Sequence, residues 1–324
     1  MKKWYTVFIL LVFVLIALAG CGESKTDSSP GQEDEPEVTE EAGNSSFPVT
    51  ITDALEEEVV VEEKPERIVS LVPGNTEIAF ALGLGDFIVG VSDHDNYPEE
   101  VFEIEKVGGM EFDIEKIIAL EPDIVLAHES SALNSIEGLE QIKNSGIAVL
   151  VVNEANSFDD VYHSIELIGK ATGTEEQAAT IIGTMQNEVE KIKEQAAQVS
   201  EKKSVLFEIS PAPEIYAAGK NTFMDEMLSI INADNAAGDL EGWPKLDEEV
   251  ILEYNPDVIV TTYGFYVDHA IEDVKAREGW QDVTAIKNGE VYDVHSDLLS
   301  RPGPRLIDGV KELAQAVYPD VFNE

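Results

Sequence analysis

Histidine is the side chain most often used as an acid, a base or a metal ligand near neutral pH, and this chain has five. No two of them stand at a spacing typical of metal ligands, and the chain has a single cysteine. It has no His-Glu-x-x-His, no nucleophile elbow and no glycine-rich phosphate loop. His94 and His128 follow the ends of predicted strands, so each is either a polar loop residue or a ligand contact. These patterns give no indication of a metal site or resident cofactor, and they count against one class of function, that of a metal-dependent hydrolase.

Aromatic side chains occur in several loops that we expect to face a ligand. They are Tyr97, Tyr216, Trp243, Tyr263, Phe265 and Tyr266. One such residue is weak evidence, because aromatics are common at the edges of a core, but a set of them favours a pocket for a large, partly apolar ligand. Asp297 and Arg301 follow the last predicted strand, and they are either polar anchors for the ligand or a surface ion pair worth about 0 to 1 kcal/mol.

A helix-turn-strand pattern occurs twice, in residues 113–126 and 247–260, and its copies start 134 residues apart. Each copy has an Asp in the position of a helix N-cap, then a Glu in the first turn, Glu115 or Glu249. Each then runs to a Pro-Asp corner and an apolar strand. Because the separation is about the size of a domain, the repeat predicts two similar α/β lobes with a ligand cleft between them.

The rest of the chain alternates apolar strands with helices, a pattern that indicates parallel sheets covered on both faces. Asn75 or Thr76 is the predicted N-cap of the first helix of the N-terminal lobe. The longest helix candidate, near 174–201, has apolar residues on one face and would extend roughly 40 Å, enough to join two lobes. The predicted parts are a signal peptide at 1–20, an acidic tether at 21–46, an N-terminal lobe at 47–173, a connecting helix at 174–201 and a C-terminal lobe at 202–324.

The N-terminal residues read as a targeting segment. Lys2 and Lys3 precede an apolar run at 4–17, and Leu18-Ala19-Gly20-Cys21 then matches the site at which bacterial lipoproteins are cleaved and lipidated. The apolar run is shorter than the roughly 20 residues of a membrane span. We therefore expect Cys21 to carry a lipid anchor on the outer face of the cell membrane, and the acidic residues at 22–46 to form a disordered tether.

The formal net charge is −44. Affinity for nucleic acid rests on Lys and Arg neutralising phosphates, so this charge argues strongly against a nucleic-acid partner. It also disfavours anionic small ligands in the absence of a local basic pocket.

Motifs spread over residues 65–318 resemble one family. They are Arg67-Ile-Val-Ser-Leu-Val-Pro-Gly-Asn-Thr-Glu77, Val89-Gly-Val-Ser92 with Tyr97-Pro98, both Pro-Asp corners, Trp243-Pro244, and Ser296-Asp297 with Arg301-Pro302. The family is the helical-backbone class of ABC-importer substrate-binding proteins, whose members carry vitamin B12, ferric siderophores or haem. The chain is most similar to the B12-binding members. The resemblance implies two α/β lobes, a connecting helix and a ligand held between the lobes.

The resemblance also implies roles for single residues. In the family one acidic residue on each lobe docks into a basic pocket of the permease, and by position in the repeat these are Glu115 and Glu249. Taken alone, a Glu in a first helical turn only complements the helix dipole, which is worth about 0.3 to 1 kcal/mol. Trp243 and Tyr97 match aromatic residues of the B12 pocket.

Two positions depart from the B12-binding pattern. Gly108-Gly109-Met110 stands where a tryptophan is expected, and His128 occupies the place of another tryptophan. We expect a corrinoid ligand, with a neutral ferric hydroxamate siderophore or haem as the runners-up. The implied partners are an ABC permease dimer and its ATPase, and the only membrane contact is the lipid anchor.

Overall fold

The structure, a computed structural model, describes residues 47–322. Cys21 and the acidic segment at 22–46 lie outside the described residues. In the N-terminal lobe four parallel strands form a sheet in the order β4-β3-β5-β6. The strands are β3 (Ile68–Ser70), β4 (Ile88–Gly90), β5 (Ile124–His128) and β6 (Ala148–Val152). The helices of this lobe are α2 (Pro73–Ala81), η1 (Gly85–Phe87), η2 (Glu99–Glu103), α3 (Ile114–Ala119), α4 (Glu129–Asn144) and α5 (Phe158–Thr172). The antiparallel hairpin β1 (Val49–Thr52) and β2 (Glu58–Val61) precedes them.

The C-terminal lobe has a second parallel sheet, in the order β12-β11-β7-β9. Its strands are β7 (Ser204–Glu208), β9 (Asp234–Asn235), β11 (Val258–Thr261) and β12 (Val291–Asp293). A short antiparallel ribbon pairs β8 (Ile215–Tyr216) with β10 (Lys245–Leu246). The helices are α7 (Phe223–Ile230), α8 (Glu248–Tyr254), α9 (Ala270–Lys275), α10 (Thr284–Asn288), α11 (Ser296–Ser300), α12 (Leu306–Val317) and α13 (Pro319–Phe322). The two sheets confirm the predicted α/β class with one parallel sheet in each lobe.

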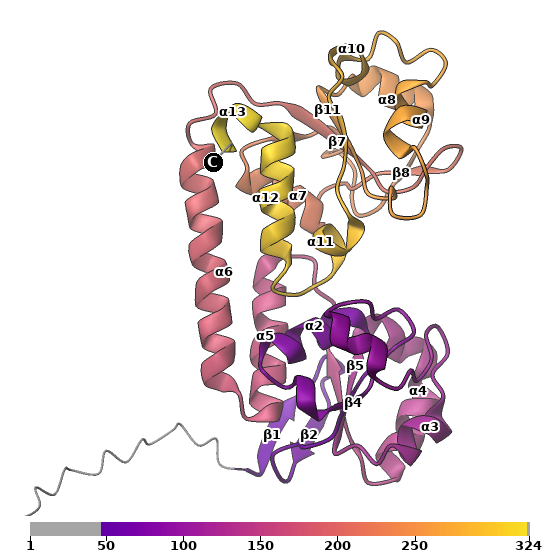
Figure 1. The fold of residues 1–324 in the computed structure, drawn as a ribbon, viewed down its shortest axis with the longest axis vertical. Coiled ribbons are helices and arrows are strands. Elements are labelled where there is room, and N and C mark those ends of the chain that lie inside the picture. The colour runs from indigo at the N-terminus through magenta and orange to yellow at the C-terminus, as the bar shows by residue number, and fades with distance from the viewer. Residues whose placement is uncertain (1–46, 323–324) are drawn as a thin grey trace, which may run out of the picture. The chain divides into compact units, whose positions relative to one another are not determined.

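The long helix is α6, from Glu175 to Ala196, and at 1.5 Å per residue it extends about 33 Å. It is shorter than the helix expected near 174–201, because residues 197–199 form a closing turn. Its buried face consists of Ala178, Ile182, Met185, Val189, Ile192 and Ala196. This face packs in the main core, and α6 contacts α5, α7 and α12 (Figure 1). Within residues 47–322, no helix combines the length and the apolar character that crossing a membrane requires.

The two Pro-Asp corners hold equivalent positions in the two sheets. The Asp123 carboxylate accepts hydrogen bonds from the backbone N–H groups of Glu66 and Arg67, at 2.8 and 2.9 Å. The Asp257 carboxylate accepts one from the backbone N–H of Ser204, at 2.9 Å. Each Asp therefore ties the start of its own strand, β5 or β11, to the start of the neighbouring strand, β3 or β7. This shared contact explains why the same corner recurs in both lobes.

The predicted cap of the first helix was wrong. Helix α2 begins at Pro73 with Val72 as its N-cap, since the fixed φ of proline suits the first helical position. Asn75 and Thr76 lie inside the helix and are buried. The Asn75 amide donates to the Ala127 carbonyl at 2.9 Å, and the Thr76 hydroxyl donates to a serine hydroxyl in β3 at 2.8 Å. These polar side chains fix α2 against the carboxyl ends of β3 and β5.

Candidate functional site

Parallel α/β sheets bind ligands at the carboxyl ends of their strands, so the loops that leave those ends form the candidate site. Most of the predicted aromatic residues have large exposed surfaces, from 39% for Tyr216 to 58% for Tyr266. The others of this exposed set are Tyr97, Trp243 and Phe265. Half-exposed aromatic rings are available to a ligand with apolar surface.

Phe265 and Tyr266, in the loop after β11, form a small cluster of rings with His295. Their ring centroids lie 4.8 Å apart in an edge-to-face arrangement. The ring of His295, which lies between β12 and α11, is 5.1 Å from that of Phe265. The His295 side chain also accepts a hydrogen bond from the Asp297 backbone N–H and thereby caps α11. His295 was not among the predicted site residues, although it directly precedes the Ser296-Asp297 motif.

Tyr263 does not share this surface, and its predicted place in the aromatic wall disagrees with its burial in this structure. Its exposed fraction is 1%, and its hydroxyl donates to the Glu208 carboxylate at 2.5 Å. Both terminal nitrogens of the Arg277 guanidinium, Nη1 and Nη2, donate to the same carboxylate. Glu208 is fully buried at the end of β7, and a buried carboxylate requires donors. Burial and the neighbouring Glu208 raise the pKa of Tyr263 well above its ordinary value.

His128 is the last residue of β5 and is also buried, with an exposed fraction of 8%. Its Nδ1 accepts a hydrogen bond from the Ser130 backbone N–H at 3.3 Å and lies 2.8 Å from the Ser130 hydroxyl, so the ring caps α4. Burial lowers the pKa of His128, against the opposing influence of Glu154 and Glu129. The structure therefore gives His128 a capping role, and its predicted ligand contact stays a prediction.

A cluster of charged side chains joins the carboxyl ends of the two sheets. Glu77, in α2, has a side chain that is only 2% exposed. Its carboxylate accepts two hydrogen bonds from Arg305, at 2.8 and 2.7 Å, and one from Arg301, at 3.1 Å. Arg301 also forms an ion pair with Asp297 at 2.9 Å. We call Glu77, Asp297, Arg301 and Arg305 the charge cluster.

The charge cluster also holds the loop that follows β4. The Asn96 amide donates to Asp297 at 3.0 Å and its carbonyl accepts from Arg301 at 2.6 Å. The Arg305 guanidinium lies over the ring of Tyr97, 3.8 Å from its centroid, in a cation–π contact. The predicted anchors Asp297 and Arg301 are thus brought together, and both are bound to residues of the N-terminal lobe.

Sequence reasoning missed three members of this site, namely Glu77, Asn96 and Arg305. All three residues are polar and lie within or next to the family motifs, and this was the signal that could have identified them. Glu77 ends the motif of residues 67–77, and Arg305 follows the Arg301-Pro302 motif by three residues. Their partners could not be inferred, because Glu77 and Arg305 are 228 residues apart.

Glu115 and Glu249, the predicted docking residues, occupy matching positions. Each is the second residue of its helix, α3 or α8, and each is exposed. Within residues 47–322, neither carboxylate takes part in a hydrogen bond or ion pair in this structure. Their neighbours differ, because Asp113 caps α3 with its side chain, whereas Asp247 makes no such bond. Both carboxylates are accordingly open to an external partner.

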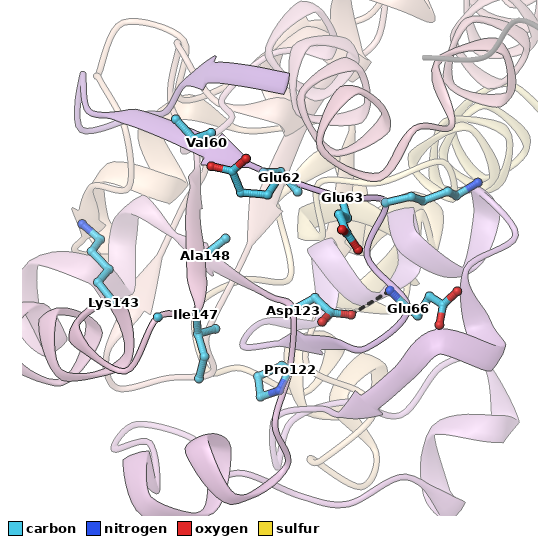
Figure 2. A pocket seen from close by; sticks show the side chains of 12 residues that line it. Val60, Glu62, Glu63, Glu66, Pro122, Asp123, Lys143, Ile147 and Ala148 are labelled. Atoms are coloured by element: carbon cyan, nitrogen blue, oxygen red, sulfur yellow. Dashed lines mark hydrogen bonds between the residues drawn. The ribbon is translucent and has the colours of Figure 1, made fainter. Parts of the chain in front are cut away.

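A separate hollow of about 660 Å³ lies at the opposite end of the N-terminal sheet (Figure 2). It is lined by Val60, Val61, Glu62, Glu63, Lys64, Glu66, Pro122, Asp123, Lys143, Gly146, Ile147 and Ala148. Asp123 and Ala148 mark the amino ends of β5 and β6. Figure 2 shows the Asp123 carboxylate bonded to the backbone at Glu66, so it serves the strand pairing described above. Since ligands bind at the other end of such sheets, we do not assign this hollow to the ligand.

The described residues contain no group of three or more His, Cys, Asp or Glu side chains that could hold a metal ion. The donor groups of the candidate site are instead committed to the charge cluster and to helix caps. Its chemistry is that of aromatic surface and paired charges, which suits binding.

Comparison with known proteins places this geometry in a family. The profile of the family described as periplasmic binding protein matches residues 68–298. The uncharacterized ABC transporter substrate-binding lipoprotein YvrC of Bacillus subtilis is 47% identical over 326 residues, covering 100% of both chains. The vitamin B12-binding protein of Vibrio parahaemolyticus is 29% identical over 259 residues, which cover 79% of this chain and 90% of that protein.

A solved structure gives the same result for the fold. It is the crystal structure of a possible iron-binding periplasmic solute-binding protein from Staphylococcus epidermidis, with a TM-score of 0.73 and 37% identity. It covers 79% of this chain and 100% of its own. The chain therefore belongs to the periplasmic binding protein family, whose members are substrate-binding proteins of ABC transporters and not enzymes, and it is an extracytoplasmic, lipid-anchored member.

Proposed function

We propose that this protein captures a corrinoid and delivers it to an ABC permease. The observation that carries the proposal is the set of exposed aromatic rings on the two lobes, with Tyr216 in β8 and Tyr97, Trp243, Phe265 and Tyr266 in loops. A corrin ring is large and partly apolar, and its amide side chains are neutral. It therefore suits aromatic walls and does not require a basic cluster. Similarity to vitamin B12-binding proteins at 29% identity supports the same ligand class.

Delivery requires a second surface, and we assign it to Glu115 and Glu249. They are exposed, occupy equivalent positions in the two lobes and bind no described residue. In a chain of net charge −44, two acidic residues on matched helix ends suit basic pockets on a permease dimer.

The second candidate ligand is a neutral ferric hydroxamate siderophore, followed by haem. The 37% identity to a possible iron-binding protein supports an iron-containing ligand as this second candidate. The test is a titration of the purified protein with cyanocobalamin, a ferric hydroxamate and haem, followed by calorimetry and tryptophan fluorescence. We expect saturable binding of cyanocobalamin. Tight binding of the ferric chelate or of haem, with no heat from cyanocobalamin, would refute the corrinoid and leave the transporter role standing.

A further inference from the structure

We infer that the site selects electroneutral ligands over anionic ones, and that Glu77 is the residue that sets this selectivity. The inference rests on the proposed function only in placing the ligand at the carboxyl ends of the strands. It concerns the charge of the ligand, which the family assignment leaves open.

Arginine is the usual side chain for binding carboxylates and other planar anions, and this chain has only four. All four lie within residues 47–322, and each is already bound. Arg67 donates to the carbonyls of Leu120 and Glu121. Arg277 pairs with the buried Glu208. Arg301 and Arg305 are the two that lie in the candidate site, and both belong to the charge cluster.

The charge cluster carries no net charge, because two guanidinium groups face two carboxylates. Both arginines bind Glu77, and Arg301 also binds Asp297. Arg301 and Asp297 have side chains that are only 15% exposed, so water screens the pairs little. An incoming anion would have to displace an internal carboxylate that is held by several charge-assisted bonds.

Lysines near the exposed aromatic residues are paired in the same way. Lys245 stands opposite Tyr216 in the β8–β10 ribbon and forms an ion pair with Glu214 at 2.6 Å. Lys220 forms one with Glu241, at 3.3 Å. These lysines near the site are thus already paired with carboxylates. The net charge of −44 also repels anionic ligands at long range.

Glu77 keeps the charge cluster electrically neutral, since its single carboxylate binds both arginines of the site. If Gln replaces Glu77, the side chain keeps its shape and one acceptor, and the charge cluster gains one positive charge. An anionic ligand can then pair with the uncompensated positive charge of an arginine, whereas a neutral ligand contacts the same aromatic side chains as before.

Ligand pairs that differ mainly in charge provide the test. One pair is cyanocobalamin and the monocarboxylic acid made by hydrolysing one of its amides. The other is a ferric trihydroxamate and a ferric tricatecholate, which present the same metal in neutral and trianionic complexes. We expect the wild-type protein to bind the neutral member of whichever pair it accepts about tenfold more tightly, or better, by calorimetry.

Three variants locate the effect. Glu77→Gln should reduce the preference for the neutral member by about tenfold, with Asp297→Asn acting in the same direction if the first variant folds poorly. Circular dichroism checks the fold of each. Glu190→Gln is the matched control, because Glu190 is an ion-paired glutamate on α6 and its change alters the net charge equally. The control should keep the wild-type preference.

Equal or tighter binding of an anionic member by the wild-type protein would overturn the inference. An unchanged preference in both Glu77→Gln and Asp297→Asn would overturn the role of Glu77. These results are distinct from failure of the corrinoid proposal. Binding of the neutral ferric chelate, with no binding of cyanocobalamin, would refute the corrinoid proposal and leave the charge selectivity standing. Binding of the anionic corrinoid at least as tight as that of cyanocobalamin would refute the charge selectivity and support the corrinoid proposal.

Discussion

The Glu77 carboxylate, in the first helix of the N-terminal lobe, receives two hydrogen bonds from the Arg305 guanidinium at the start of α12, 228 residues later. Arg305 in turn covers the ring of Tyr97. The contact therefore links α2 of the N-terminal lobe to α12 of the C-terminal lobe, and Arg305 also positions the Tyr97 ring of the candidate site. The side chain of Glu77 is 2% exposed, so this ion pair is shielded from water and differs from the exposed pairs of the chain.

Replacement of Glu77 by Ala should destabilise the protein by about 3 kcal/mol. The reason is that Arg301 and Arg305, with side chains 15% and 21% exposed, would lose their shared counter-ion. Chemical denaturation measures the free energy of unfolding. Glu105→Ala, which removes the partner of Lys116 in an exposed pair, is the control and should change little. Equal losses in the two variants would contradict the special role of Glu77.

Trp243→Ala should weaken ligand binding and leave the fold intact. Trp243 is 46% exposed, so its removal leaves no large cavity. If a ligand covers the ring fully, truncation costs about 3 kcal/mol, or about a hundredfold in Kd. Calorimetry gives the Kd and circular dichroism the fold. Trp243→Phe keeps most of the aromatic surface and should lose less, and an unchanged Kd in the alanine variant would exclude Trp243 from the site.

Reversal of Glu115 and Glu249 to Lys in one variant should abolish uptake and permease binding. Ligand affinity should stay within about twofold, because neither side chain belongs to the ligand-facing loops and surface charges contribute little to folding. Uptake in cells and co-purification with the permease provide the two measurements. Glu176→Lys with Glu194→Lys reverses two exposed acids on α6 and changes the net charge equally. Normal uptake by the docking variant, or loss in the control, would refute the assignment.

The stability of the protein should decrease as the pH falls below the ordinary histidine value. Burial lowers the pKa of His128 from 6.5, so the unfolded state takes up a proton first as the medium is acidified. The free energy of unfolding therefore falls with pH in the window just below 6.5 and is retained above it. His128→Asn keeps an acceptor for the Ser130 N–H and should show a smaller loss. Urea denaturation at about pH 7.5 and about pH 5.5 compares the two proteins, and parallel losses would exclude His128 as the cause.

Cys21→Ser should abolish lipidation and release the protein or leave it with an uncleaved signal peptide. The prediction rests on the sequence alone, because Cys21 lies outside the described residues. In the sequence, Leu18-Ala19-Gly20-Cys21 follows an apolar run. Mass spectrometry of membrane-extracted protein shows whether Cys21 is modified. An unmodified Cys21 in the wild-type protein from membranes would contradict the anchor.

Much of the fold could be predicted from local sequence patterns. The repeat with Glu115 and Glu249 in its first turns indicated equivalent helices in two α/β lobes, and the structure contains them as α3 and α8. A cap and a short amphipathic helix can be recognised in the sequence because they involve residues within a few turns of each other. The Pro-Asp corner can also be recognised, although its Asp123 bonds to Glu66 and Arg67, which lie 57 and 56 residues earlier. The cap of α2 was still misplaced, since the Asn75 side chain binds the distant strand β5 and the Thr76 side chain binds the preceding strand β3.

The candidate site depended on tertiary structure. Tyr263 and Tyr266 are the same residue type three positions apart, yet one is 1% exposed and the other 58%. The difference arises because the buried Glu208, in β7, requires the Tyr263 hydroxyl as a donor. Likewise, Arg301 could be recognised as polar and near a strand end, but its partner Glu77 lies 224 residues away. The sequence determined which side chains stand at the ends of the strands, and only long-range packing decided which of them are buried, paired or open to a ligand, because burial and ion pairing depend on residues that the chain brings together after folding.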